Sequence, residues 1–357
     1  MINIAIVGAT GVVGQQFLVA LQNHPWFQIS KLVASERSAG KTYREALYKD
    51  GIFSWYCDEI IKEDLLNMKV IGMEDFNPNN VDLVFTALDS SEAKIVEPKL
   101  AEKVPVISTA SAFRYQEDVP LLIPGVNNEH AELIRVQKEK RGWKGFITPI
   151  PNCTTTGLAI TLKPLDENFG LDKVLMTSMQ AVSGAGRSSG VLALDIIDNL
   201  IPYIPNEEEK VQRETKKILG KFEGNIIKPS EVKVSCTCIR VNVRDGHTES
   251  VFISAKREVN VEEAKFSFKN FGKSLRELNL PSAPKEMIVV HEDPSRPQPR
   301  LDRDTYGGMA TVVGRIRRDE ALPNGLKYVL LSHNTKMGAA KGAVLLAELL
   351  YKLGYLE

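Results

Sequence analysis

The first part of the chain carries a hydrophobic and glycine pattern that predicts a strand, a turn and a helix. The segment "INIAIVGATGVVGQQFLVALQNHP" opens with an apolar run typical of a buried strand, and its turn then holds Gly8, Gly11 and Gly14. Apolar side chains next recur at helical spacing, at Phe17, Leu18 and Leu21. Such glycines let the backbone approach a diphosphate, which the following helix N-terminus stabilises. The spacing differs from G-x-G-x-x-G, so the flanking strand and helix carry the prediction of a dinucleotide site.

The pattern then repeats as alternating strands and helices. Apolar runs in "ISKLVAS", "VDLVFTAL" and "VPVIST" predict further strands, and "SEAKIVEPKLAEK" predicts a helix between the last two. Alternation of this kind is typical of α/β proteins with a doubly wound parallel sheet. We therefore predict a Rossmann-type domain over residues 1–150.

From about residue 150 the sequence pattern changes to longer runs in which polar and apolar residues alternate. The segments "KVLMTSMQAVSGAG", "EVKVSCTCIRVNV" and "TESVFISAKREV" predict strands of a sheet with one covered face. We predict a second, α+β domain over 151–334 that includes the helix "EEEKVQRETKKIL". The apolar C-terminal helix, within 335–357, is expected to return to the first domain.

Composition limits the possible partners. A chain of 357 residues with 43% hydrophobic residues is long enough for two cores, and 45 basic residues balance 45 acidic ones. This balance disfavours nucleic acid as a partner. Four cysteines are few for a disulfide framework, and apolar runs are too short for a membrane span or a signal peptide. We expect a cytoplasmic protein without a membrane partner.

The residues after the second strand bear on the choice of cofactor. Ser35, Arg37 and Ser38 stand where an acidic residue would bind the ribose 2′-hydroxyl of NAD. An arginine with serine donors suits a 2′-phosphate, which favours NADP. A solvated turn is the alternative, and Glu36 leaves NAD possible as well.

Cys153 is the first candidate for chemistry. It lies in "FITPIPNCTTTGLAI", where a loop becomes a helix. A cysteine is most often a small buried hydrophobe. Here, however, polar neighbours and the positive end of a helix dipole would stabilise a thiolate.

His247 is the candidate partner for this thiol. It follows a turn at Asp245-Gly246, and a hairpin would bring it to the same end of a sheet as Arg240. A histidine in a turn is often only a surface residue, but with Cys153 it completes a thiol/imidazole pair. Cys236 and Cys238 lack a matching pair at zinc spacing, so core packing is favoured over a metal site.

Nine segments along the chain can be compared with known families: "GATGVVGQQF", "ASERSAGKTY", "STASAFRYQEDVPLLIPGVN", "PNCTTTGLA", "QAVSGAGRSSG", "EEEKVQRETKKILG", "CIRVNVRDGHTE", "RPQPRLDRD" and "HNTKMGAAKGAVLLAELL". Taken in order, they resemble aspartate-β-semialdehyde dehydrogenases of the archaeal and fungal type, within the glyceraldehyde-3-phosphate-dehydrogenase-like group. These segments span nearly the whole chain, which makes the resemblance far more specific than any one motif.

The resemblance implies roles for individual residues. The catalytic positions would be Cys153 as nucleophile, His247 as acid/base, and Gln180 and Asn152 as orienting groups. For the substrate, it implies Arg240 for the α-carboxylate, Glu207 for the ammonium, and Lys210 and Arg114 for phosphate. Implied cofactor contacts are Gly8, Thr10, Gly11, Val12, Val13, Ser35, Arg37, Ser38, Ser183, Gly184 and Asn334.

The implied activity is NADP-dependent reduction of L-4-aspartyl phosphate to L-aspartate 4-semialdehyde through a cysteine thioacyl intermediate. It would serve biosynthesis of lysine, threonine, methionine and isoleucine, in a homodimer or homotetramer. Three alternatives stay open at this point. They are N-acetylglutamyl-phosphate reductase, which needs room for an acylated amine; malonyl-CoA reductase, which binds no amino group; and a non-enzymatic NADP sensor.

Overall fold

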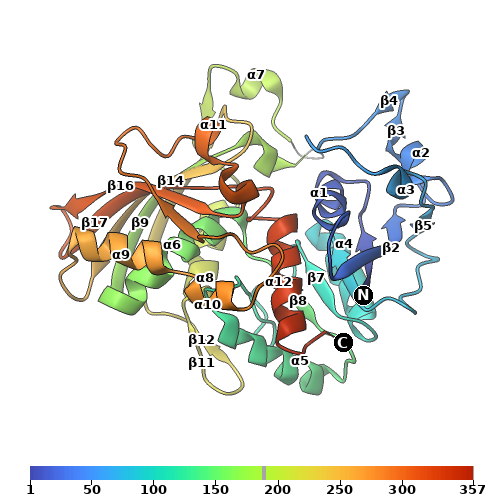
Figure 1. Cartoon of the computed structure of the whole chain (residues 1–357), viewed down its shortest axis with the longest axis horizontal. Helices are drawn as coiled ribbons and strands as arrows, with labels where there is room; N and C mark the ends of the chain where they lie inside the picture. The colour runs from blue at the N-terminus through green and yellow to red at the C-terminus, as the bar shows by residue number, and fades with distance from the viewer. Residues whose placement is uncertain (187–189, 357) are drawn as a thin grey trace.

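A six-stranded parallel sheet organises the N-terminal part of the computed structural model, which describes residues 1–186 and 190–356 (Figure 1). The strand order is β5-β2-β1-β6-β7-β8. The bounds are β1 Ile2–Val7, β2 Phe27–Ala34, β5 Val70–Gly72, β6 Leu83–Thr86, β7 Val106–Ser108 and β8 Ile147–Pro149. The strands are largely buried on both faces, as expected for a parallel sheet covered by helices.

Alternate residues of β1 pack into different cores. Ile4 and Ile6 share one hydrophobic cluster with helices α1 (Val12–Leu21) and α12 (Ala340–Lys352). Ala5 and Val7 belong to another cluster, with Leu100 and Ala101 of α4 (Ser90–Ala101). Helices therefore cover both faces, and the predicted doubly wound α/β class is confirmed.

Helix α12 carries the end of the chain back to this sheet, where it shares the cluster with α1. Its apolar side chains, including Leu345, Leu346 and Leu349, are fully buried, which stabilises the fold by about 1.5–3 kcal/mol for each such side chain. The predicted C-terminal segment 335–357 includes residue 357, which lies outside the described residues.

A seven-stranded mixed sheet forms the second part, in the order β10-β13-β9-β14-β17-β16-β15. Its bounds are β9 Leu171–Gln180, β10 Leu200–Ile201, β13 Lys233–Val241, β14 His247–Ala255, β15 Ile288–Val290, β16 Thr311–Asp319 and β17 Gly325–Ser332. The helices α6 (Cys153–Phe169), α8 (Glu207–Ile218) and α9 (Val261–Asn270) contribute to its core. The predicted α+β character of the second domain is confirmed.

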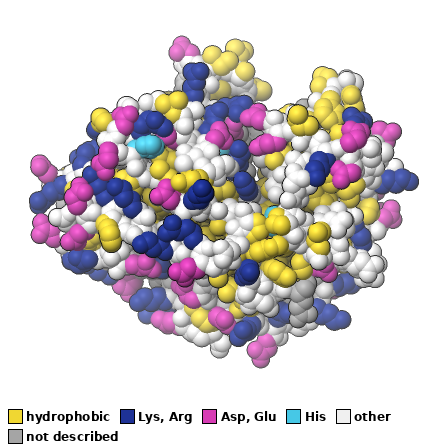
Figure 2. All heavy atoms as spheres, in the orientation of Figure 1, with side chains coloured by type: hydrophobic (Ala, Val, Ile, Leu, Met, Phe, Trp, Pro, Cys, Tyr) yellow, Lys and Arg dark blue, Asp and Glu magenta, His cyan; other side chains and the backbone are white. Residues whose placement is uncertain are grey.

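The remaining elements are short, except for helix α5, which has 9 residues. They are α2 Tyr43–Leu47, β3 Tyr48–Lys49, β4 Ile52–Phe53, α3 Glu63–Leu66, η1 Asn128–Glu132, α5 Leu133–Arg141, η2 Val182–Ala185, α7 Ala193–Ile196, β11 Lys221–Phe222, β12 Ile227–Lys228, α10 Lys273–Glu277, α11 Pro299–Asp302 and η3 Thr305–Gly308. No helix in the described ranges is long and apolar enough to cross a membrane. Figure 2 shows basic and acidic side chains interspersed over one face, as the balanced composition suggests.

The predicted hairpin between β13 and β14 is wrong. Strand β9 lies between them, parallel to β13 and antiparallel to β14. The intervening turn crosses the end of β9, so Arg240 and His247 still reach the same end of the sheet. The sequence could not reveal this, because β9 enters from more than fifty residues upstream. Cys236 and Cys238 are buried in the core, as predicted.

Candidate active site

Cys153 is the first residue of α6, and Asn152 caps that helix. The Asn152 Oδ1 atom accepts hydrogen bonds from the backbone N–H groups of Thr154 and Thr155, at 3.0 and 3.2 Å. Asparagine is a favoured N-cap because its side chain satisfies donors that the first helical turn leaves free. The loop-to-helix transition predicted for Cys153 is therefore present, and the cap fixes where the thiol stands.

Two buried glutamates of α8 hold Asn152 in turn. The Asn152 side-chain amide donates to Glu207 Oε1 at 2.8 Å, and its backbone N–H donates to Glu214 Oε2 at 2.7 Å. Glu207 is 5% exposed and Glu214 is fully buried. Helix α8 thus anchors the start of α6, so the nucleophile position depends on two elements far apart in sequence.

His247 meets Cys153 from the first position of β14. Its Nε2 atom lies 3.3 Å from Cys153 Sγ, and its Nδ1 accepts a hydrogen bond from the backbone N–H of Ala181 at 3.1 Å. Burial, together with the nearby Arg240 guanidinium, lowers the pKa of His247 to about 3. Burial and the negative charge of Glu207 raise the pKa of the Cys153 thiol, whereas Arg240, Arg114 and the Thr154 N–H lower it. Burial outweighs the helix N-terminus here, which favours a neutral pair.

Arg240 lies beside this pair on β13. Its Nη1 atom donates to the carbonyl oxygen of Ala181 at 2.7 Å, and the residue is 5% exposed. Gln180 stands opposite Arg240 in the ladder between β9 and β13, and its amide donates to Ser178 Oγ at 3.2 Å. A Cβ added to Gly184 would lie 3.0 Å from both the Arg240 guanidinium and the His247 ring. Glycine at this position lets both side chains share one end of the sheet.

The basic residues Lys210 and Arg114 lie on the other side of Cys153. Lys210 Nζ is 3.5 Å from Glu207 Oε2 on the first turns of α8. Arg114 donates to Glu214 Oε1 at 3.0 Å and to the Thr109 carbonyl at 3.1 Å. Its buried Nε has no hydrogen-bond partner in the part of the chain that the structure describes. A buried donor without a partner is costly, so this atom favours an anionic ligand.

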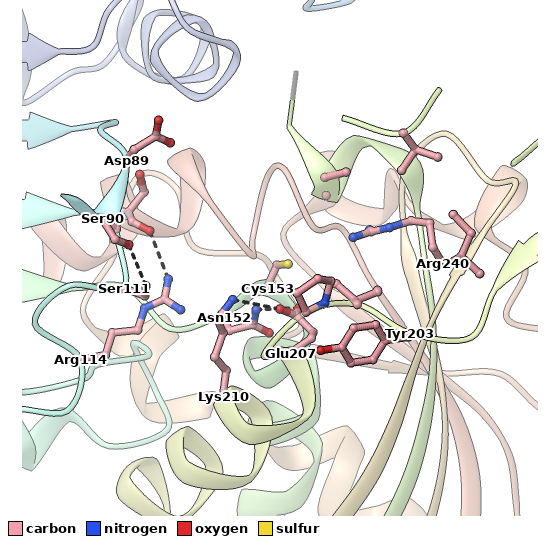
Figure 3. A pocket seen from close by; sticks show the side chains of 18 of the residues that line it. Asp89, Ser90, Ser111, Arg114, Asn152, Cys153, Tyr203, Glu207, Lys210 and Arg240 are labelled. Carbon is pink, nitrogen blue, oxygen red and sulfur yellow. Dashed lines mark hydrogen bonds and ion pairs between the residues drawn. The ribbon is translucent and has the colours of Figure 1, made fainter. Parts of the chain in front are cut away.

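These side chains line one cavity of about 740 Å³ (Figure 3). In Figure 3, Ser90, Ser111 and Arg114 lie on one side, Tyr203 and Arg240 on the other, and Cys153 between them. Ser90 and Ser111 are joined by a 2.8 Å hydrogen bond between their hydroxyl groups. The cavity thus offers cations on both sides of a thiol and two carboxylates, Asp89 and Glu207.

Curated relatives decide the family. The aspartate-semialdehyde dehydrogenase of Archaeoglobus fulgidus is 51% identical over 353 residues, which cover 98% of each chain. That of Methanothermobacter thermautotrophicus is 45% identical, over 99% of this chain and all of the relative. This chain belongs to the aspartate-semialdehyde dehydrogenase family.

Family models and solved structures agree with this assignment. A semialdehyde dehydrogenase NAD binding domain matches residues 3–134, and a semialdehyde dehydrogenase dimerisation domain matches residues 162–337. A structure of the Candida albicans aspartate semialdehyde dehydrogenase with NADP superposes with a TM-score of 0.89 at 40% identity, over 99% of both chains. Vibrio cholerae aspartate semialdehyde dehydrogenase II, complexed with ASA, gives 0.77 at 28% identity, over 98% of both. The predicted family is confirmed.

A second, smaller cavity of about 220 Å³ adjoins the first, and both are lined by Thr109, Arg114, Asn152, Cys153 and Gly184. Among the residues that line it are Val12, Val13, Ser183, Gly184 and Asn334, all five of which were singled out for the cofactor. Asn334 donates to Ser183 Oγ at 2.8 Å and accepts from the backbone N–H of Gly246 at 2.9 Å. Cys153 therefore borders both cavities, as a reaction between substrate and cofactor requires.

The glycine turn fits a dinucleotide diphosphate. Gly8 has a φ of +82°, and a Cβ there would lie 2.4 Å from the Ala87 carbonyl oxygen. A Cβ on Gly14 would lie 2.2 Å from the Gly8 carbonyl oxygen, so strand, turn and helix pack as closely as glycine permits. Gly11 caps α1 without a side-chain hydrogen bond, which leaves the first N–H groups of the helix free for an anion.

The other residues predicted for the cofactor lie around this turn and after β2. Thr10 accepts a hydrogen bond from Gln15 through its carbonyl oxygen. Ser35 and Ser38 close a turn by a 2.9 Å backbone hydrogen bond, and Arg37 is exposed. The Glu36 carboxylate accepts from the backbone N–H of Glu74 at 3.3 Å, on the side of β5. A 2′-phosphate is therefore the better match than a ribose hydroxyl for this turn.

Sequence reasoning missed two residues that support the site. Glu214 joins Asn152 to Arg114, and the motif "EEEKVQRETKKILG" contains it without indicating which glutamate points inward. Gly338 lies against the nucleophile, where an added Cβ would be 2.8 Å from Cys153 Cβ. A glycine between Met337 and two alanines carries no recognisable signal, since only the close approach of the turn before α12 to Cys153 requires it.

Proposed function

We propose that this chain catalyses the NADP-dependent reduction of aspartyl phosphate to aspartate semialdehyde. The observation that carries the proposal is the 3.3 Å approach of Cys153 Sγ to His247 Nε2, at a cysteine that lines both a charged cavity and a cavity beside the glycine turn. Relatives of the same family carry this activity in their names. The activity places the protein in the biosynthesis of the aspartate family of amino acids.

Cys153 is the nucleophile in this proposal. Its sulfur attacks the acyl carbon, and the phosphate leaves with the electron pair of the broken C–O bond. The Cys153 backbone N–H would bind the carbonyl oxygen as negative charge develops on it, since the Asn152 side chain already accepts from the next two N–H groups of α6. The Gln180 amide would help to orient the acyl group. Asn152 acts through its cap, because it sets the point at which α6 begins.

The charged side chains match the substrate group by group. Arg240 binds the α-carboxylate, since its planar guanidinium forms paired hydrogen bonds with carboxylates. Glu207 binds the α-ammonium. Lys210 and Arg114 bind the phosphate, and the unpaired Nε of Arg114 supports this assignment.

We assign NADP binding to residues 1–150 with the C-terminal segment 335–357, and catalysis and dimerisation to 151–334. Gly8, Thr10, Gly11, Val12 and Val13 would hold the diphosphate, and the turn at 35–38 the 2′-phosphate. Ser183, Gly184 and Asn334 would line the nicotinamide side of Cys153. When bound, NADPH supplies the hydride for the thioacyl carbon.

The alternative activities are not favoured. The family relatives reported above carry the aspartate-semialdehyde dehydrogenase name, and Glu207 in the substrate cavity suits a free ammonium. The dimerisation-domain match supports a dimer with a small-molecule substrate. We further propose that the protein forms a homodimer or a homotetramer. We also propose that it is cytoplasmic, which is consistent with its four free cysteines.

The reverse reaction tests this function. Purified protein is mixed with aspartate semialdehyde, NADP and phosphate or arsenate, and NADPH formation is followed by absorbance. We expect turnover that requires both the aldehyde and the anion. Cys57→Ser, which alters a free cysteine outside both Cys153 cavities, serves as the matched control and should keep the wild-type rate. Absence of turnover in the wild type would reject the proposed activity.

A further inference from the structure

The two residues proposed for phosphate, Arg114 and Lys210, come from different kinds of element. Lys210 lies on the first turns of α8, whereas Arg114 lies in the loop of residues 109–120, which has no helix or strand. The same loop carries Ser111 into the substrate cavity. Its internal backbone hydrogen bonds are turn contacts of 3.2 to 3.3 Å, so other elements have to fix its course.

Lys217 on α8 supplies that support. Its Nζ atom donates to the carbonyl oxygens of Arg114, Gln116 and Val119, at 2.9, 2.8 and 2.7 Å. An ammonium group has three N–H donors, so this loop uses all of them. Lys217 therefore has no donor left for a substrate, and any effect that it has on the reaction must come through the loop.

Other side chains of α8 bind the same part of the loop. Glu214, one turn before Lys217, accepts from the Arg114 guanidinium at 3.0 Å and from the Tyr115 hydroxyl at 3.3 Å. The Arg213 guanidinium lies over the Tyr115 ring, 3.9 Å from the ring centre. Helix α8 thus holds Arg114 at both ends, because Lys217 binds its backbone and Glu214 binds its side chain.

We propose that Lys217 is a positioning residue for the phosphate group. By fixing the backbone of the Arg114 loop to α8, it sets Arg114 in one position relative to Lys210 on the same helix. Two cations that are already arranged around one anion bind it more tightly, because binding then orders nothing further. The inference rests on the proposed function, since it takes Arg114 and Lys210 as the phosphate ligands.

The direct test is Lys217→Met, which removes the ammonium group but keeps a long side chain. In the reverse reaction, KM for phosphate should rise by roughly tenfold, the size of one hydrogen bond to a charged group. KM for aspartate semialdehyde and KM for NADP should stay at their wild-type values, since Lys217 contacts none of the residues assigned to those ligands. An equal rise in every KM would show a general structural role and would overturn the proposal.

Lys216→Met is the matched control. Lys216 is the neighbour of Lys217 on α8, and its side chain has no hydrogen bond or ion pair among the described residues. The control should keep the wild-type KM for phosphate, and a rise equal to that of Lys217→Met would overturn the role of the loop. If Lys217→Met does not fold, Lys217→Gln takes its place with the same expectation, since glutamine also lacks the charge.

A double-mutant cycle shows whether Lys217 acts through Arg114. Once Arg114→Met has removed the ligand, Lys217→Met should have little further effect on KM for phosphate. Effects of the two substitutions that multiply in the double variant would show that Lys217 acts elsewhere, and would overturn the proposal.

A measurement without turnover separates this inference from the proposed activity. Inorganic phosphate bound beside Cys153 should slow alkylation of that thiol by iodoacetamide, which peptide mass spectrometry follows. Lys217→Met should raise the phosphate concentration that gives half-protection by roughly tenfold. If this protection and its shift occur without turnover of aspartate semialdehyde, the positioning role stands and the proposed function fails. Turnover by Lys217→Met with wild-type KM and wild-type half-protection would overturn the positioning role alone.

Discussion

The two cavities that meet at Cys153 are lined by different kinds of residue. The substrate side is lined by Arg114, Glu207, Lys210 and Arg240, three of which are less than 7% exposed. The cofactor side is lined mainly by glycines, small polar residues and apolar side chains such as Val12 and Ile150, and Arg114 is the one charged residue that lines both sides. Charge-changing substitutions should therefore act mainly through the substrate side, whereas added volume should act mainly through the cofactor side.

Cys153→Ser should have the largest effect, because Cys153 is shared by both sides. A serine hydroxyl has almost no ionised form near neutral pH, so turnover should be nearly abolished while NADP binding and folding persist. The measurements are kcat in the reverse assay, NADP affinity by fluorescence and the unfolding midpoint. Near wild-type turnover would remove Cys153 from the mechanism.

Arg240→Lys should have the next largest effect, on the substrate side. Lysine keeps the charge but loses the planar fork and the 2.7 Å hydrogen bond to Ala181. Loss of one partner of a desolvated pair costs about 2–5 kcal/mol, so kcat/KM for aspartate semialdehyde should fall by roughly 30-fold to several-thousand-fold. KM for NADP should not change, and a parallel rise in both constants would contradict the division between the cavities.

Arg37→Ala should have a smaller effect, confined to the cofactor side. If Arg37 contacts the 2′-phosphate, KM for NADPH should rise by about tenfold, the size of one hydrogen bond to a charged group, and KM for NADH should not. The paired measurement is KM for each cofactor in wild type and variant. Equal changes for both cofactors would reject Arg37 as the 2′-phosphate ligand.

Glu207→Gln should be milder than Arg240→Lys. The glutamine keeps an oxygen for Asn152 Nδ2, so the cap remains, but it loses the charge that attracts an ammonium. We expect kcat/KM for aspartate semialdehyde to fall by about threefold to tenfold, with little change for succinate semialdehyde, which lacks the amino group. An equal loss on both aldehydes would show that Glu207 is not an ammonium ligand.

A substitution of Glu97 should have the smallest effect, and that effect is on the free energy of unfolding. This buried carboxyl of α4 accepts from Thr86 and from Ser108, whose Oγ in turn accepts from the Ala110 N–H beside the substrate cavity. Burial raises the pKa of Glu97 to about 7, so the folded state binds its proton more tightly than the unfolded state does.

The sign of the pH dependence follows from that raised pKa. Ionisation of Glu97 costs folding free energy, and this cost grows from the ordinary carboxyl pKa of about 4.5 up to about 7, then levels off. Relative to wild type, Glu97→Gln should therefore gain stability as pH rises through this window. Urea unfolding at several pH values measures it, and a constant difference would contradict the raised pKa.

The sequence predicted the cofactor side better than the substrate side, for a physical reason. Gly8, Gly11 and Gly14 act within one local strand, turn and helix, so spacing alone suggests their use. Cys153, Glu207, Arg240 and His247 come together only through four separate elements, α6, α8, β13 and β14, and the roles of Glu207 and Arg240 were available only from family resemblance. The wrong hairpin between β13 and β14 reflects the same limit, since strand order depends on distant pairing.

The account depends most on a covalent bond between Cys153 and substrate. The direct measurement is peptide mass spectrometry of enzyme that has been mixed with aspartate semialdehyde and NADP without phosphate, then quenched in acid. Without an anion to release it, the oxidised acyl group should remain as a thioester on the peptide that contains Cys153, and on none that contains Cys57, Cys236 or Cys238. Turnover with phosphate but no adduct on Cys153, or an adduct on another cysteine, would contradict the account.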